Sequence, residues 1–147
     1  MTGGSGFIGS NFINLIMERF EEINIINFDA MYYCASVENI DLKWRNSKRY
    51  TFIKGNLCSM DLVRHVLDTH NPTHVIHFAA QSHVQNSFSD ALQYTQDNIV
   101  GTHTLLEACR LYSKIKKFIH VSTDEVYGES MMSIDEKHKT EHSVLCP

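Results

Sequence analysis

The sequence predicts an α/β fold in which a doubly wound parallel sheet carries helices on both faces. Short apolar stretches typical of buried strands alternate with longer amphipathic stretches along the chain. A turn with three glycines, Gly3, Gly6 and Gly9, opens the first amphipathic stretch. Clusters of small and polar residues directly follow the apolar stretches. Ligands of open parallel sheets bind outside the carboxyl ends of the strands, so these clusters mark the expected site.

Length and composition describe one globular domain. The chain has 147 residues, of which 43% are hydrophobic and 20% are charged. Its formal net charge of −4 gives no reason to expect nucleic acid or an acidic membrane as a partner. No apolar run approaches the roughly 20 residues of a membrane span. The four cysteines lack the paired spacing of a metal site. We therefore expect a cytoplasmic protein that binds no metal.

The glycine turn predicts a binding site for phosphate. A helix that begins in such a turn points its first backbone N–H groups at an anion, and its dipole favours negative charge there. Gly3 would permit the tight turn, Gly6 the close approach of a pyrophosphate, and Gly9 the packing of helix on sheet. The alternative is an ordinary glycine loop. One face of the helix would carry the apolar side chains of Ile8, Phe12, Leu15 and Ile16.

An acidic residue follows the next predicted strand at the distance that a dinucleotide site requires. Residues 23–28 form this strand, and Asp29 ends it twenty residues after Gly9. A carboxylate here can bind the ribose hydroxyls and repels a 2′-phosphate, which favours NAD over NADP. The alternative is an acid that caps a helix or a turn. Only Met1 and Thr2 precede the turn, so the first strand of a Rossmann-like sheet would be largely missing.

The rest of the chain continues the alternation of strands and helices. Further strands are predicted at residues 50–54, 74–78 and 117–121, with helices at 59–70 and 89–112. Leu92 and Ile99 belong to the apolar residues at helical spacing in the second of these helices. Residues 31–46 are expected to form a loop, and residues 129–147 are polar and irregular.

Three clusters at the predicted strand ends complete the candidate site: Asn56-Leu57, Ala79 to Ser82, and Thr123 to Glu125. Small side chains at Ala79 and Ala80 would let a flat cofactor lie close to the backbone, or would serve only tight packing. Two adjacent carboxylates can act as acid and base if their environments separate their pKa values. The alternative for this pair is a solvated acidic turn.

Segments 2–9, 78–84, 98–102 and 121–128 together resemble the nucleotide-sugar (dTDP-glucose/UDP-glucose) 4,6-dehydratases, which belong to the extended short-chain dehydrogenase/reductases. The resemblance implies an NAD-dependent lyase that converts dTDP- or UDP-glucose to a 4-keto-6-deoxy sugar and forms a homodimer. Related sugar epimerases share the glycine turn but usually carry other residues where this chain has Asp124 and Glu125, which makes an epimerase the less favoured reading.

The resemblance also assigns roles to residues. Glu125 would take the proton from sugar C5, Asp124 would protonate the departing C6 hydroxyl, and Thr123 would hold the C4 hydroxyl. Ser82 would touch the sugar as well as the cofactor. The residues implied to line NAD are Gly3, Gly6, Phe7, Ile8, Gly9, Asp29, Asn56, Leu57, Phe78, Ala79, Ala80, Gln81 and Ser82.

The chain departs from the family pattern at several positions. Asn56 stands where the family usually has an aspartate that contacts adenine, and Ala30 stands where a lysine is common. In the family, a Tyr-x-x-x-Lys motif follows the acidic triplet by about thirty residues, so here it would begin just past Pro147. We therefore expect residues 1–147 to be an incomplete NAD-binding domain without the substrate domain. The alternative is a catalytically inactive fragment that binds a dinucleotide or serves as an interaction module.

Overall fold

The computed structural model describes residues 1–127 and confirms the predicted parallel α/β architecture. The elements, in order, are α1 (Phe7–Arg19), β1 (Ile25–Asp29), η1 (Val37–Asn39), α2 (Leu42–Arg45), β2 (Tyr50–Lys54), α3 (Met60–His70), β3 (His74–His77), α4 (Val84–Ser89), α5 (Ala91–Thr95), η2 (Gln96–Val100), α6 (Gly101–Tyr112), β4 (Lys117–His120) and η3 (Asp124–Tyr127).

The sheet consists of two parallel strand pairs that a single residue joins. β1 pairs with β2, and β3 pairs with β4. Thr2 forms parallel bridges to Phe28 of β1 and to His77 of β3. Its N–H donates to the Ile76 carbonyl at 3.1 Å, and its carbonyl accepts from the Phe78 N–H at 3.0 Å. In residues 1–127, the first strand of the Rossmann-like sheet is thus reduced to Thr2, as the sequence predicts.

A cavity of about 650 Å³ lies where the rest of a central strand would run. Its walls include the amino-terminal half of β1 on one side and β3 on the other. The Met1 ammonium group occupies one end and donates to the Ile26 carbonyl at 2.7 Å. Burial lowers the pKa of this amino group to about 6, because the charged form loses its hydration there.

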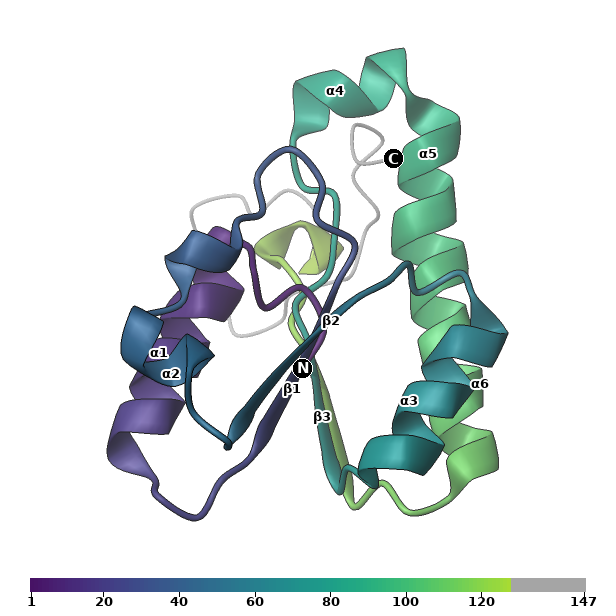
Figure 1. The fold of residues 1–147 in the computed structure, drawn as a ribbon. Helices are drawn as coiled ribbons and strands as arrows, with labels where there is room; N and C mark the ends of the chain where they lie inside the picture. The colour runs from purple at the N-terminus through teal and green to yellow at the C-terminus, as the bar shows by residue number, and fades with distance from the viewer. Residues whose placement is uncertain (128–147) are drawn as a thin grey trace, which may run out of the picture.

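Helices cover both faces of the sheet (Figure 1). Helices α3 and α6 pack on one face, where Phe28, Val75 and Leu105 belong to the larger apolar core. Helix α1 covers the other face, where Ile13 and Ile25 belong to the smaller core. Because both faces are covered, the strands are positioned from both sides, and their carboxyl ends are left to form the site.

The buried face of α1 differs from the predicted one. Ile8 is 63% exposed and Leu15 is 45% exposed, whereas Ile13 and Met17 are fully buried. The small residue Gly9 is buried against the glycine turn. This contact fixes the rotation of the helix, because only the face that carries Gly9 can approach the turn so closely.

Residues 89–112, predicted as one helix, form α5, the π-helical turn η2 and α6. Leu92 and Ile99, predicted at helical spacing, are 85% and 62% exposed. A π-turn takes up an extra residue and so changes which side chains share a face. The predicted loop at 31–46 likewise contains the short helices η1 and α2. Within the described part of the chain, no helix is long and apolar enough to cross a membrane.

Candidate dinucleotide site

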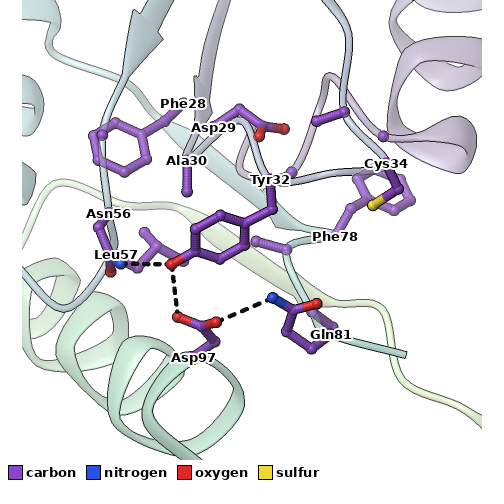
Figure 2. A pocket seen from close by; sticks show the side chains of 16 residues that line it. Phe28, Asp29, Ala30, Tyr32, Cys34, Asn56, Leu57, Phe78, Gln81 and Asp97 are labelled. Atoms are coloured by element: carbon purple, nitrogen blue, oxygen red, sulfur yellow. Dashed lines mark hydrogen bonds between the residues drawn. The ribbon is translucent and has the colours of Figure 1, made fainter. Parts of the chain in front are cut away.

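A cavity of about 120 Å³ lies at the carboxyl ends of β1, β2 and β3, on the side of the sheet where α1 begins (Figure 2). It is lined by Gly3, Gly6, Phe28, Asp29, Ala30, Tyr32, Cys34, Ala35, Gly55, Asn56, Leu57, Phe78, Ala79, Ala80, Gln81 and Asp97. The glycine turn, Asp29, Asn56-Leu57 and the segment that begins at Ala79, all expected at the ligand edge, therefore contribute residues to one cavity, whereas the triplet after β4 does not.

The glycine turn is held by contacts that leave no room for side chains. Gly3 has a φ of 71°, and a Cβ there would lie 2.5 Å from the Ala79 backbone nitrogen. A Cβ on Gly9 would lie 2.3 Å from the Gly3 carbonyl oxygen. At Gly6, by contrast, the nearest atom would be 3.5 Å away. Gly6 is the N-cap of α1 and provides no side-chain cap, so the first N–H groups of the helix remain available for an anion.

Asp29 is fixed by two backbone donors. Its Oδ2 accepts from the Ser5 N–H at 2.9 Å, and its Oδ1 accepts from the Met31 N–H at 2.8 Å. The residue is only 7% exposed. Met31 adopts a φ of 62°, a left-handed conformation that turns the chain directly after this second donor. A carboxylate has about four acceptor positions, so each oxygen can still accept a ribose hydroxyl.

Tyr32 reaches across the cavity and joins two of its walls (Figure 2). Its hydroxyl accepts from Asn56 Nδ2 at 2.9 Å and donates to Asp97 Oδ1 at 3.1 Å. Partial burial and the negative charge of Asp97 raise the pKa of the Tyr32 hydroxyl above its usual value. Tyr32 therefore stays a neutral donor, and it links the loop after β1 to the end of β2 and to η2.

The loop after β3 is tied to η2 by amide contacts. The Gln81 N–H donates to Asn98 Oδ1 at 2.7 Å, and Asn98 Nδ2 donates to the Gln81 carbonyl at 2.9 Å. The side chains of Gln81 and Gln93 donate to Asp97 Oδ2 at 3.2 and 3.0 Å. These contacts hold Asp97 at the rim of the cavity, with its other oxygen towards Tyr32.

Most of the predicted cofactor residues line the cavity: Gly3, Gly6, Asp29, Asn56, Leu57, Phe78, Ala79, Ala80 and Gln81. Phe7, Ile8, Gly9 and Ser82 do not line it. Phe7 and Ile8 are exposed at the start of α1, where only their backbone N–H groups can face a phosphate. Gly9 packs α1 against the glycine turn itself, whereas the sequence analysis assigned it to the packing of helix on sheet.

Sequence reasoning did not select Tyr32 or Asp97, and only the structure brings them together. The one signal for Asp97 is its position directly before the 98–102 segment on the long amphipathic stretch. Tyr32 lies in a predicted loop next to another tyrosine, Tyr33, which is 70% exposed. Nothing in the local pattern distinguishes the two.

The acidic triplet follows β4 at the same edge of the sheet. The Val121 N–H donates to the His77 carbonyl at 3.0 Å, which extends the β3–β4 pairing beyond β4 itself. Thr123 and Asp124 are exposed, and η3 begins at Asp124. Neither residue lines the cavity beside Asp29. The side chain of Glu125 lies outside the described part of the structure, so its predicted role stays a prediction.

A buried histidine supports the centre of the sheet below the site. The His77 ring forms hydrogen bonds with two hydroxyl groups. Its Nδ1 lies 2.6 Å from the Thr2 hydroxyl, and its Nε2 lies 2.9 Å from the Thr102 hydroxyl. Burial, together with His120 and the Met1 ammonium group, lowers the pKa of His77 to about 4. The ring is therefore neutral at pH 7. Across residues 1–127, no three histidine, cysteine or acidic side chains cluster as a metal site would require.

The family profile described as GDP-mannose 4,6 dehydratase matches residues 1–146. A trifunctional UDP-glucose 4,6-dehydratase/UDP-4-keto-6-deoxy-D-glucose 3,5-epimerase/UDP-4-keto-L-rhamnose-reductase of Arabidopsis thaliana is 45% identical over 130 residues. That match covers 88% of this chain and 19% of the Arabidopsis protein. The chain therefore spans about a fifth of the length of this relative.

Solved structures with sequences 30% or more identical to this chain share its fold. The dTDP-glucose 4,6-dehydratase of Bacillus anthracis, solved in complex with NAD, superposes with a TM-score of 0.82 at 34% identity. The match covers 97% of this chain and 42% of that one. The UDP-glucose 4-epimerase of Thermotoga maritima, solved with UDP-glucose, gives a TM-score of 0.76 at 30% identity, over 90% of this chain and 40% of that one.

Proposed function

Because the chain belongs to the GDP-mannose 4,6-dehydratase family, we propose that it is the NAD-binding part of a nucleotide-sugar 4,6-dehydratase. The observation that carries this proposal is the meeting of the glycine turn, the fixed Asp29 carboxylate and the loop after β3 around one cavity. A pyrophosphate on the first N–H groups of α1 and a ribose on Asp29 would use groups that the fold has already oriented. The NAD-bound relative supports the choice of cofactor.

The residues present fit a dinucleotide. Gly6 leaves open space at the start of α1, where a Cβ would have no neighbour closer than 3.5 Å. Asp29 offers a negative charge that would repel the 2′-phosphate of NADP. When bound, NAD supplies an acceptor for the hydride of the sugar and later its donor. The protein's own part is to hold ribose and phosphate in place and to keep the Asp29 carboxylate oriented by Ser5.

The substrate end of the reaction is assigned to the triplet after β4. Thr123 would hold the sugar C4 hydroxyl, Asp124 would protonate the departing C6 hydroxyl, and Glu125 would take the C5 proton. General acid–base help of this kind typically contributes about 10²–10⁴-fold to a rate. The position of the triplet at the ligand edge of the sheet supports this assignment, and the dTDP- and UDP-sugar relatives support a nucleotide sugar as the substrate.

Titration of the chain with NAD and NADP tests the cofactor proposal. The unaltered chain should bind NAD more tightly than NADP. Asp29→Ala should narrow the difference between the two affinities, because the charge that repels the 2′-phosphate is removed. Both titrations can be followed by calorimetry. Tighter binding of NADP by the unaltered chain would contradict the proposal.

A chimera tests the chemistry. Residues 1–127 of this chain would replace the matching part of the Bacillus anthracis dehydratase, and 4-keto product from dTDP-glucose would be measured. Asp124→Asn should slow loss of water, and Glu125→Gln should allow oxidation at C4 while elimination fails, so that bound NADH accumulates. The structural likeness to a UDP-glucose 4-epimerase favours a second candidate, a C4 epimerase. A folded chimera that turns over to the C4 epimer without 4-keto product would support that candidate instead.

A further inference from the structure

We propose that Asn39 is a positioning residue of the dinucleotide site, because it holds the Ser5–Gly6 peptide in the orientation that keeps the start of α1 open to a pyrophosphate. This inference rests on the proposed function, since it names what keeps the phosphate end of that site in shape. Asn39 does not line the cavity, and it lies in the segment 31–46 that the sequence predicts as a loop.

Strand β1 fixes Ser5 through two side chains. Ser5 is fully buried, and its N–H donates to Asp29 Oδ2 at 2.9 Å. Its hydroxyl oxygen accepts from Asn27 Nδ2 at 3.1 Å. Asn27 and Asp29 are two residues apart in β1, so both side chains extend from the same face of the strand. These contacts fix the amide and the side chain of Ser5, and they leave the orientation of its carbonyl group to other residues.

The carbonyl of Ser5 is held by the segment around η1. It accepts from Asn39 Nδ2 at 2.9 Å and from the Ser36 N–H at 3.1 Å. The Asn39 N–H in turn donates to the Ser36 carbonyl at 3.2 Å, and the Asn39 carbonyl accepts from Asn14 Nδ2 of α1 at 3.1 Å. The next residue, Ile40, is fully buried in the smaller core. Ser36 and Asn39 thus form a clamp that has a fixed position relative to α1.

The Ser5–Gly6 peptide needs this clamp because Gly6 is a glycine. Rotating the peptide by half a turn would carry the φ of Gly6 from −74° into the positive range, while its ψ would stay at 173°. That combination is accessible essentially to glycine alone. On its other side, the peptide has one long hydrogen bond, from the Gly6 N–H to the Gly3 carbonyl at 3.4 Å. The two donors of the clamp therefore supply most of the resistance to a flip.

A flipped peptide would disrupt the phosphate end of the site. Ser5 is buried, whereas Gly6 is the N-cap of α1 and lines the cavity. The flip would move the Ser5 carbonyl oxygen away from Ser36 and Asn39 and direct it beside the first N–H groups of the helix. A phosphate that binds there needs donors, so an oxygen at this place would repel it. The clamp thus keeps an acceptor out of a site that must present donors.

Amide hydrogen exchange in the ligand-free chain tests the clamp. Asn39→Ala removes one of the two donors, so the Ser36 N–H should exchange about three- to tenfold faster, which corresponds to the loss of one net hydrogen bond. The Ser5 N–H should keep its rate, because a flip of the following peptide leaves its bond to Asp29 intact. Adding Gly6→Ala should restore slow exchange at Ser36, since alanine cannot adopt the flipped conformation. Equal acceleration at Ser5 and Ser36, or no restoration by Gly6→Ala, would overturn the proposal.

Titration with NAD and with adenosine tests the consequence for the ligand. Asn39→Asp sets a carboxylate against the Ser5 carbonyl, so the flipped peptide should become the main form. NAD should then bind at least about tenfold more weakly, because only the unflipped fraction can bind it. Adenosine has no phosphate and should bind as before. Asn14→Asp is the matched control, because it adds the same charge next to Asn39 without a contact to Ser5, and it should change the affinity for NAD much less.

The outcomes for this clamp and for the dinucleotide site can be told apart. If Asn39→Asp weakens the binding of NAD and adenosine by the same factor, or weakens NAD binding no more than Asn14→Asp does, the positioning role of Asn39 is wrong. If the unaltered chain binds neither NAD nor adenosine, the proposed function fails, while the exchange rates of the ligand-free chain still test the clamp.

Discussion

Gly9 and Gly6 are three residues apart in the same turn, yet their surroundings differ sharply. A Cβ on Gly9 would lie 2.3 Å from the Gly3 carbonyl oxygen and 2.8 Å from the Gly4 Cα, both of them backbone atoms that cannot move aside cheaply. A Cβ on Gly6 would meet nothing closer than 3.5 Å, and the φ of Gly6 is −74°. The spacing of glycines in a sequence does not reveal this difference.

We therefore expect Gly9→Ala to destabilise the protein by about 1–3 kcal/mol, because the new methyl group must push α1 away from the turn. Gly6→Ala should cost less, at most about 1 kcal/mol, because it loses only the preference for glycine over alanine at the N-cap. Urea denaturation followed by circular dichroism measures both. The expectation fails if the two variants unfold at the same urea concentration.

His77 makes stability depend on pH. Its pKa is about 4 in the folded chain and near 6.5 in an unfolded one, so the unfolded chain binds more protons between these values. The stabilisation is fully present above pH 6.5 and is lost as the pH falls towards 4. It amounts to on the order of 3 kcal/mol. The Met1 amino group acts in the same direction at higher pH, because its pKa falls from 8.0 to about 6 on folding.

Unfolding measurements between pH 8 and pH 4 check this expectation. His77→Gln should be less stable at pH 7 but should lose less further stability below pH 6.5. His65→Gln, on the exposed surface of α3, is the control and should follow the unaltered chain. A pH profile of His77→Gln that parallels the unaltered chain would show that another group causes the acid sensitivity.

At the scale of the elements, a cavity of about 650 Å³ lies between the amino-terminal parts of β1 and β3. Parallel strands alternate the direction of their backbone groups. The Thr2 N–H donates to the Ile76 carbonyl, and the Phe28 N–H donates to the Met1 carbonyl. By this alternation, three further backbone groups face the cavity: the Ile26 N–H, the Ile76 N–H and the His74 carbonyl. Exposed edges of this kind favour aggregation.

A designed extension can fill this cavity. Adding Val-Ile-Leu-Val ahead of Met1 should complete the pairing, replace the buried ammonium group with a peptide bond, and bury apolar side chains on both faces of the sheet. Each buried side chain contributes about 1.5–3 kcal/mol, so the melting temperature should rise by at least about 5 °C. In the control, proline replaces the last valine of the extension, directly before Met1. This residue lacks the N–H that would bond to the His74 carbonyl, so the control should raise the melting temperature much less. Equal melting temperatures for the two extensions would contradict this account.

At the scale of the whole molecule, the described residues provide the cavity that we propose for a dinucleotide, and the triplet after β4 to which we assign the substrate end. Oxidation of a sugar hydroxyl needs a base, and in the family that this chain resembles a Tyr-x-x-x-Lys pair provides it. The spacing occurs at Tyr50–Lys54 and at Tyr112–Lys116. Tyr50 begins β2, and Tyr112 ends α6 just before β4 starts, so both lie at the amino-terminal edge of the sheet, opposite the cavity.

We therefore expect the 147-residue chain alone to form no 4-keto product from dTDP-glucose or UDP-glucose in the presence of NAD. Product formation would be measured by the absorbance of the 4-keto sugar in alkali, with the Bacillus anthracis enzyme as the positive control. Conversion by the chain alone would show that another residue supplies the base.

The sequence determined the architecture and most of the residues that line the cavity at the ligand edge. Strand and helix periods are local properties, and carboxyl ends of parallel strands must meet at one edge, so the positions of Gly3, Asp29, Asn56 and Ala79 could be predicted together. The dominant function class followed from the resemblance, because its segments are continuous in the chain. These predictions needed no knowledge of side-chain packing.

Only the tertiary structure decided which faces are buried and which side chains close the site. The rotation of α1 depends on the contact between Gly9 and the turn, and the register after α5 depends on the π-turn. Tyr32 meets Asp97 although 65 residues separate them. Such contacts arise from packing between distant segments, whose energies depend on three-dimensional distance and not on position along the chain.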